Sequence, residues 1–220
     1  GCGSSAAALL AGVLLANHFG RLNWTTQQIL EEACRREGHP DNVAACYLGG
    51  MTASASSGSR VITATCGENL TWNLLLALPS ASLATEKARA LLPPAYTRAD
   101  AVANMQATAL LVSAFAQNRP ELLRVAMQDR IHQPYRMEAC QLLPLLLPLN
   151  EHPGVLGVAL SGAGPSLLVI AENASSALPE ISREAANDPT LEILQTSIAG
   201  GAIQAGSLPL STSASGLKSS

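Results

Sequence analysis

The chain has 220 residues, 48% of them hydrophobic and 13% charged, so it holds enough apolar material for a substantial core, which excludes disorder over most of its length. The formal net charge is −3 and the lysines are Lys87 and Lys218, which leaves no basic stripe for nucleic acid and no polybasic anchor for a membrane. The longest apolar run, 6–16, falls short of a membrane-spanning length, so we expect a soluble protein without nucleic-acid or membrane partners.

The first third of the chain is predicted to form three helices followed by two strands. Helix-forming residues after Ser4 and Ser5 predict a first helix with the serine pair at its N-cap. Thr25 and Gln28 have the spacing of a capping box, which starts the second helix, and Pro40 ends it. The predicted helices span 6–19, 25–38 and 42–48, and the strands, which are rich in β-branched or aliphatic residues, span 60–66 and 70–78.

The rest of the chain alternates predicted helices and strands. A glycine-rich turn at 161–165 separates two apolar strands, and Pro144 and Pro148 interrupt the leucine-rich helical stretch before them. The predicted helices span 85–92, 98–117, 121–131, 137–149 and 177–186, and the strands span 155–160, 166–171 and 191–196. A serine-rich tail at 207–220 is expected to be disordered. This order of elements predicts an α+β fold.

Five cysteines are scattered along the chain, and no Cys-x-x-Cys pair suggests a zinc site or a redox couple. Free thiols fit a reducing compartment, so we expect the protein in the cytoplasm or, in a plant, in the plastid stroma. The first residue is Gly1 rather than Met and lies inside a glycine-rich segment, so we expect the beginning of the protein to be missing.

The segment Gly1-Cys2-Gly3-Ser4-Ser5 opens the first predicted helix and is a candidate phosphate site. Backbone N–H groups, the positive end of the helix dipole and two hydroxyls meet there. A dinucleotide fingerprint would need a second strand ending in an acid, where this stretch is helical, and a P-loop would need a lysine. A plain serine-capped helix start remains the alternative interpretation.

Glu37 continues the apolar face of the second predicted helix, so its carboxylate is expected to point inward. A carboxylate at a helix C-terminus meets the negative end of the dipole and needs a positive partner, for which a magnesium ion bridging phosphates is suitable. The alternatives are that Glu37 is a surface acid, His39 a loop residue and Asp41 the N-cap of the next helix.

Arg89 and Arg136 are candidates for a forked grip on a carboxylate, because charged residues are scarce in this chain and a guanidinium binds a carboxylate more specifically than lysine does. The alternative is that both are ordinary helix-surface arginines paired with nearby acids. The turn at 161–166 taken alone is interpreted as structural.

Four segments together resemble motifs of the GHMP small-molecule kinases, and within them the homoserine kinase family. In chain order they are GCGSSAAA, EGHPDNVAACYLGG, DRIHQPYR and GVALSGAGPS, and their spacing agrees with the family. The resemblance runs from residue 1 to about residue 206. It implies a GHMP kinase fold in which 1–69 is the C-terminal part of a ribosomal-protein-S5-like, ATP-binding domain, 70–206 is a ferredoxin-like α+β domain and 207–220 is a tail.

The resemblance also implies the reaction and the residues on the nucleotide side. The γ-phosphoryl group of ATP would pass to the side-chain hydroxyl of L-homoserine, giving O-phospho-L-homoserine, a step toward threonine. The family also suggests a homodimer. The ATP phosphates would bind at Gly1, Gly3, Ser4 and Ser5, and Mg²⁺ would be held by Glu37 and Ser5.

The same resemblance implies the acceptor-binding residues. Asn42 would orient the homoserine hydroxyl, and Asp41 would serve as a base or bind the ammonium group. The full acceptor set is His39, Asp41, Asn42, Thr85, Arg89 and Arg136, with the two arginines on the carboxylate. The third motif, Ser161, Gly162, Ala163 and Gly164, would shape the site.

The chain departs from the family in lacking a further N-terminal stretch that holds the first motif and part of the nucleotide pocket. Cys2 stands where leucine is usual and Ala45 where proline is expected, and neither position supplies a functional side chain. We therefore expect exposed apolar surface and no competent ATP binding by this chain alone. The alternatives are another GHMP kinase acting on a different small alcohol, and a non-catalytic fragment that keeps the fold.

Overall fold

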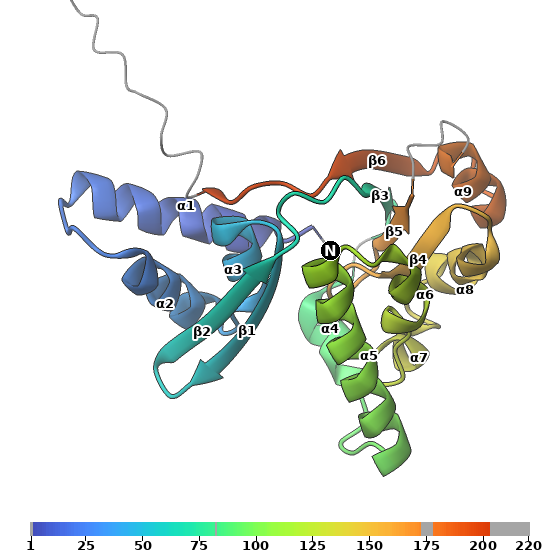
Figure 1. The fold of residues 1–220 in the computed structure, drawn as a ribbon, viewed down its shortest axis with the longest axis horizontal. Helices are drawn as coiled ribbons and strands as arrows, with labels where there is room; N and C mark the ends of the chain where they lie inside the picture. The colour runs from blue at the N-terminus through green and yellow to red at the C-terminus, as the bar shows by residue number, and fades with distance from the viewer. Residues whose placement is uncertain (1, 82, 173–177, 203–220) are drawn as a thin grey trace, which may run out of the picture.

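The structure is a computed structural model that describes residues 2–81, 83–172 and 178–202. Gly1 and the predicted tail at 207–220 lie outside the described residues. The chain forms two units that lie side by side, an N-terminal unit of residues 2–66 and a C-terminal unit built from residues 73–197 (Figure 1). None of the helices in the described part is both long and apolar enough to cross a membrane.

The N-terminal unit holds three helices and a β-hairpin. The helices are α1 (Ser4–Phe19), α2 (Thr26–Glu37) and α3 (Asp41–Leu48), as predicted within two residues. The hairpin pairs β1 (Met51–Ser57) with β2 (Arg60–Cys66) in antiparallel register. β1 was not predicted, because its serines and alanines have low strand propensity and its partner strand supplies the pairing. A hydroxyl pair, Ser54 and Thr63 at 2.9 Å, links the two strands.

The two helix starts differ in how they are capped. At α2 the predicted capping box is confirmed, because the Gln28 N–H donates to Thr25 Oγ1 and the Thr25 N–H donates to Gln28 Oε1. At α1 the predicted serine cap is wrong. Gly3 is the N-cap, with the left-handed φ of 69°, and Ser4 and Ser5 are the first helical residues, without a side-chain cap. Their hydroxyls are therefore not used in capping the helix.

The C-terminal unit is a four-stranded antiparallel sheet with the order β4-β5-β3-β6. Helix α5 (Arg98–Gln117) connects β3 to β4, and α9 (Leu178–Ala186) connects β5 to β6. This β-α-β-β-α-β order is the ferredoxin-like arrangement, so the predicted fold class is confirmed. The strands are β3 (Asn73–Leu78), β4 (Val155–Leu160), β5 (Leu167–Ala171) and β6 (Glu192–Ser197).

Shorter helices fill the long connections and differ most from prediction. The predicted helix 121–131 is cut to a 3₁₀ turn and α6, and the predicted helix 137–149 begins only at residue 142. The predicted interruption is confirmed at Pro148, where α8 gives way to η2, whereas Pro144 is the third residue of α8, in the first turn, where a helix tolerates proline. The elements are α4 (Thr85–Ala90), η1 (Pro120–Leu122), α6 (Leu123–Ala126), α7 (Gln133–Arg136), α8 (Leu142–Leu146) and η2 (Leu147–Glu151).

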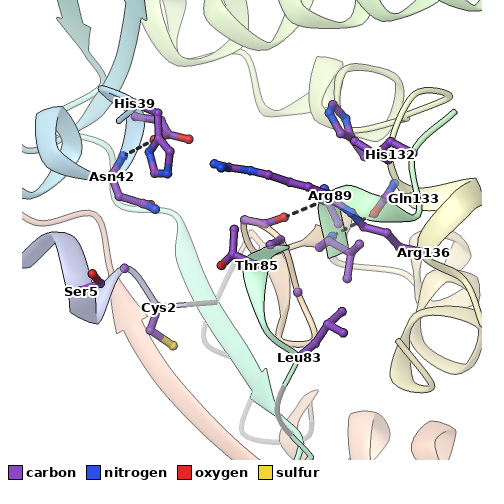
Figure 2. A pocket seen from close by; sticks show the side chains of 18 of the residues that line it. Cys2, Ser5, His39, Asn42, Leu83, Thr85, Arg89, His132, Gln133 and Arg136 are labelled. Atoms are coloured by element: carbon purple, nitrogen blue, oxygen red, sulfur yellow. Dashed lines mark hydrogen bonds and ion pairs between the residues drawn. The ribbon is translucent and has the colours of Figure 1, made fainter. Parts of the chain in front are cut away.

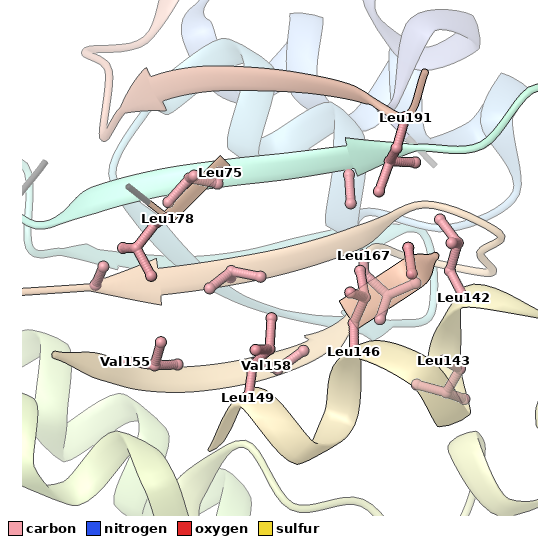
Figure 3. Close-up of a cluster of buried hydrophobic side chains, with 14 of the residues drawn as sticks. Leu75, Leu142, Leu143, Leu146, Leu149, Val155, Val158, Leu167, Leu178 and Leu191 are labelled. Atoms are coloured by element: carbon pink, nitrogen blue, oxygen red, sulfur yellow. The ribbon is translucent and has the colours of Figure 1, made fainter. Parts of the chain in front are cut away.

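Strands β3, β4 and β5 are covered on both faces, whereas the edge strand β6 is mostly exposed. Alternate residues of the strands face opposite sides, so Leu75 and Leu167 pack with α8 and α9, whereas Leu156 and Ile170 pack with α5 and α6. Figure 3 shows the first of these clusters, with the leucines of α8 lying against β4 and β5. The rigid sheet therefore fixes the positions of the loops at its ends.

The two units are joined twice. Residues 67–72 lead from β2 into β3, and after β6 the chain returns to the end of α3 (Figure 1). There the Gly50 N–H donates to the Ala199 carbonyl at 3.0 Å, and Gly49 forms a bridge with Gly200. A Cβ on Gly49 would lie 2.1 Å from the Gly201 nitrogen, so this backbone contact requires glycine.

The N-terminal unit exposes apolar side chains, in agreement with the sequence expectation. Phe19 of α1 is 78% exposed, and Leu15 and Ile62 are more than half exposed. Helix α1 is apolar on all sides, yet only its Ala6, Leu10 and Val13 are buried.

Helix α8 offers a matched test of this packing. Leu143 is fully buried, whereas Leu145 in the same helix is 42% exposed. Leu143→Ala is expected to lower the free energy of unfolding by about 2–5 kcal/mol, because it leaves a cavity in the core. Leu145→Ala is expected to change it by less than about 1 kcal/mol. Urea unfolding of both variants measures the difference, and equal losses would contradict the core assignment.

Candidate functional site

A cavity of about 640 Å³ lies between the two units. The N-terminal unit contributes the start of α1, the end of α2 and the start of α3, and the C-terminal unit contributes α4, α7 and the turn between β4 and β5. The predicted site residues that line it are Gly3, Ser4, Ser5, Glu37, His39, Asp41, Asn42, Thr85, Arg89, Arg136, Gly162, Ala163 and Gly164. Figure 2 shows side chains from both units facing this cavity. The four sequence motifs therefore meet in space.

The opening of α1 is held in an unusual backbone conformation. Gly3 has φ 69°, which favours glycine, and a Cβ placed there would lie 3.5 Å from the Asn42 side chain. The first N–H groups of α1 have no acceptor inside the helix and lie at the positive end of its dipole. Together these features form the anion-binding surface that the glycine-serine segment predicts.

Glu37, the last residue of α2, faces this opening. The Ser5 hydroxyl donates to Glu37 Oε2 at 3.5 Å, across 32 positions of sequence. Glu37 is half-buried and lines the cavity, so the predicted inward orientation is confirmed and the surface-acid interpretation is wrong. Gly38 follows in the left-handed conformation and ends the helix there.

His39 and Asp41 lie at the same edge of the cavity. His39 Nδ1 lies 2.6 Å from Asp41 Oδ1, although this contact lacks the angular geometry of a hydrogen bond. The side chain of Asp41 is mostly exposed. Asp41 is the first residue of α3 and Pro40 is the N-cap, so the interpretation of Asp41 as the N-cap is wrong. Asn42 follows, and its own N–H donates to Asp41 Oδ1 at 2.9 Å.

The two arginines differ sharply in their surroundings. Arg89 is exposed, and its side chain extends across the cavity toward His39 (Figure 2). Arg136 is 6% exposed, and its Nε and Nη1 donate to the carbonyls of Ala88 at 3.3 Å and Gly162 at 3.4 Å. Neither forms an ion pair with a carboxylate of the described residues, so the surface-pair interpretation is wrong for both.

The third motif forms a closed turn between β4 and β5. The Ser161 N–H donates to the Ser166 carbonyl at 2.9 Å, and the Gly164 N–H donates to the Ser161 carbonyl. Gly164 has φ 85°, and a Cβ there would lie 2.9 Å from Cys140 Sγ, so both conformation and space require glycine. Ser161 is absent from the cavity lining, so of the third motif only residues 162–164 face the site. Gly1 lies outside the described residues.

Three polar residues of the cavity were missed as site residues, although they lie in the quoted motif DRIHQPYR. They are Asp129, His132 and Gln133. Gln133 is buried, and its Oε1 accepts from the Leu160 N–H at 2.9 Å. The sequence did contain a signal for them: Asp129 precedes His132 by three positions and Gln133 by four, a spacing typical of a carboxylate that caps a turn.

Asp129 accepts hydrogen bonds on both oxygens. Its donors are Asn104 Nδ2 at 2.7 Å and the N–H groups of residues 131, 132 and 133. Burial alone would raise the pKa of this carboxyl, but the hydrogen bonds from His132, Asn104 and the backbone outweigh burial and hold the pKa well below its usual range. Asp129 is therefore ionised at neutral pH and fixes the turn that leads into α7.

No group of three or more His, Cys, Asp or Glu side chains gathers to hold a metal ion among the residues that the structure describes. A magnesium ion in proteins is commonly held by one or two carboxylates and completed by phosphates and water. Glu37 with the adjacent Ser5 hydroxyl has the donor chemistry for that mode of binding.

Comparison with known proteins gives a consistent family. The family model of the GHMP kinases N terminal domain matches residues 1–50, and that of the GHMP kinases C terminal matches residues 111–187. Similar curated proteins are the homoserine kinases of Solibacter usitatus, 46% identical over 82% of this chain, and of Desulfitobacterium hafniense, 42% identical over 77%. The chain spans 60% and 57% of the length of these two relatives.

Solved structures show the same fold. A homoserine kinase from Cytophaga hutchinsonii has a TM-score of 0.81 at 23% identity, covering 90% of this chain and 66% of that one. The mevalonate kinase of L. major, solved with R-mevalonate, has a TM-score of 0.65 at 15% identity, covering 90% and 67%. At these identities the likeness concerns the fold alone.

Asp129 gives a pH-dependent prediction. Its folded pKa lies below the ordinary value of about 3.9, so the stability it contributes is present above that value and is lost as pH falls through the folded pKa. Asp129→Asn is expected to lower the free energy of unfolding by about 1–3 kcal/mol at pH 7. This difference in unfolding free energy between the variant and wild type should become smaller below pH 4.

Denaturant unfolding at pH 7 and pH 3 measures this difference. The control is Glu138→Gln, an exposed acid in the same region for which no hydrogen bond is found among the described residues. A gap between Asp129→Asn and wild type that is the same at both pH values would contradict the ionised state of Asp129.

Proposed function

The chain belongs to the GHMP kinase family, and we propose that it carries the phosphate-binding and acceptor-binding residues of an enzyme that phosphorylates the side-chain hydroxyl of L-homoserine with ATP. The observation that carries the proposal is the Ser5–Glu37 contact at the opening of α1, in a cavity that Arg89 and Arg136 reach from the other unit. The product would be O-phospho-L-homoserine, a step toward threonine.

The nucleotide phosphates bind at the start of α1. Gly3 turns the backbone so that the N–H groups of the first helical turn face the cavity, and the Ser4 and Ser5 hydroxyls add donors. The negative charge of the phosphates meets the positive end of the α1 dipole, which faces the cavity.

Glu37 and Ser5 are the residues that would hold Mg²⁺. When bound, the metal neutralises phosphate charge and templates the triphosphate. The single carboxylate leaves most coordination positions to phosphate and water, as magnesium commonly requires. Glu37 also meets the unfavourable end of the α2 dipole, which a cation relieves.

The acceptor binds between the units with its carboxylate toward the C-terminal unit. Arg136 is held in place by backbone carbonyls and Arg89 is free to close on the ligand, which together give a forked grip on a carboxylate. Thr85 lies one helical turn before Arg89 and adds a hydroxyl. The hydroxyl end of the acceptor then lies toward His39 and Asn42.

The transfer itself depends on alignment and charge neutralisation more than on a strong base. Asn42 lines the cavity beside Gly3, where a Cβ would come within 3.5 Å of the Asn42 side chain, and it is the residue that would orient the acceptor hydroxyl toward the phosphate. Asp41 is mostly exposed, which suits a partner for the ammonium group better than a base tuned by burial.

We also propose the cytoplasm, or the plastid stroma in a plant, as the place of the reaction, because all five cysteines are free thiols. We propose that the protein assembles as a homodimer.

The acceptor can be identified by a substrate panel. Full-length protein with ATP and Mg²⁺ should form ADP and a phosphate monoester with L-homoserine, with kcat/KM at least about tenfold above that for L-serine, mevalonate or galactose, since each tenfold is about 1.4 kcal/mol of transition-state binding. Coupled ADP release and ³¹P NMR of the product measure this. Preference for L-serine, mevalonate or galactose would overturn the homoserine assignment and leave a different GHMP kinase.

The two halves of the cavity should respond differently to substitution. Arg89→Ala is expected to raise KM for homoserine about tenfold or more while KM for ATP stays within about twofold, because only the acceptor loses a charged contact. Glu37→Gln is expected to lower kcat and to raise the Mg²⁺ concentration needed for half-maximal rate. Arg119→Ala, an exposed arginine paired with Glu121, is the matched control and should change neither. Equal losses for both substrates in Arg89→Ala would contradict its role.

A further inference from the structure

Helix α7 has only four residues, yet its side chains hydrogen-bond to α4, to the end of β4 and to the glycine turn that follows. A helix of one turn has no stability of its own, because nucleation costs more than its few hydrogen bonds return. Something outside α7 must therefore hold it in place.

The Asp129 carboxylate supplies part of this support. Oδ2 accepts from the His132 N–H at 2.8 Å and from the Gln133 N–H, and Oδ1 accepts from the Ile131 N–H at 3.0 Å. These are the N–H groups that the start of a short helix leaves without partners. A carboxylate at this position also meets the positive end of the local peptide dipoles.

Asn104 anchors the carboxylate to the rest of the protein. Its Nδ2 donates to Asp129 Oδ1 at 2.7 Å, and its Oδ1 accepts from the Arg130 N–H at 2.8 Å, so both ends of the amide are used. Asn104 belongs to α5, a helix of 20 residues that packs on one face of the sheet. The loop before α7 is thus tied to the most extended rigid element of the unit.

Two side chains of α7, those of Gln133 and Arg136, connect the helix to the elements that line the cavity. Gln133 accepts from the Leu160 N–H at the end of β4, and Arg136 donates to Ala88 of α4 and to Gly162 of the glycine turn. Both side chains are at least nine-tenths buried, so they cannot swing away without leaving polar groups unpaired. α4 carries Thr85 and Arg89, so their position also depends on this contact.

We propose that Asn104 and Asp129 are positioning residues for acceptor binding: through α7 they set where Arg136 and α4 stand relative to the glycine turn. The inference rests on the proposed function and deepens it. Within the described residues, no hydrogen bond joins the set Asn104, Asp129, Gln133 and Arg136, here called the α7 network, to α1 or α2. The nucleotide side should therefore be left nearly unaffected when the α7 network is loosened.

The test compares Asn104→Ala with Gln106→Ala in the full-length protein. Both remove an amide from α5, but Gln106 is exposed and lies outside the α7 network. Asn104→Ala is expected to raise KM for L-homoserine about tenfold while KM for ATP stays within about twofold, because misplaced binding groups cost affinity and rate. Gln106→Ala should match wild type. A purely structural role would lower apparent kcat through the folded fraction and leave both KM values unchanged, which would overturn the proposal.

A readout without substrate separates this inference from the proposed function. Amide hydrogen exchange of residues 130–136 should become at least about tenfold faster in Asn104→Ala, while exchange in α1 stays unchanged. Unchanged exchange at 130–136 would overturn the proposed support of α7 whatever the activity. If wild type turns over no homoserine, the proposed function fails, but the exchange result still shows whether Asn104 supports α7. Should Asn104→Ala fold poorly, Asn104→Ser, which replaces the amide with one hydroxyl, is measured in the same way. Its exchange at 130–136 should be faster than in wild type, and unchanged exchange would overturn the support of α7.

Discussion

The cavity depends on one packing condition, which is the close approach of α1 to α2. Ala6 of α1 and Ala33 of α2 are both fully buried in the core of the N-terminal unit, and side chains of this size let two helices approach closely. With that approach, Ser5 at the start of one helix comes within 3.5 Å of Glu37 at the end of the other. A helix start that attracts anions then faces a carboxylate that attracts cations, and a metal-bound phosphate satisfies both.

The two halves of the cavity are built by different means. On the N-terminal side the chemistry comes from helix ends, so backbone geometry at Gly3 and Gly38 sets it. On the C-terminal side it comes from side chains that hydrogen bonds to backbone groups hold in place, as the Ala88 carbonyl does for Arg136 and the Leu160 N–H does for Gln133. A substitution on the first side acts through backbone conformation, whereas one on the second side acts through hydrogen bonds.

The sequence predicted the elements with local signals and missed those that depend on distant partners. The capping box at Thr25 and the turn after Leu160 are encoded within a few residues, and both were found. β1 has a weak strand pattern and exists because β2 pairs with it. For the site, the motifs predicted residues that line one cavity, but not the support of α7, because Asn104 lies 25 positions from Asp129 and nothing in its local sequence marks it.

Arg89 and Arg136 show why residue type alone leaves a role undecided. Both were assigned to the same carboxylate, yet Arg136 has already lost its rotamer freedom to the carbonyls of Ala88 and Gly162, whereas Arg89 is exposed. Ordering a free arginine on a ligand costs about 1–2 kcal/mol of side-chain entropy, and for Arg136 folding has already met this cost. In the function proposed above, the fixed arginine would set the direction of the acceptor carboxylate, and the exposed one would close on it after binding. Acceptor selectivity would then depend on the contacts that fix Arg136 to the carbonyls of Ala88 and Gly162.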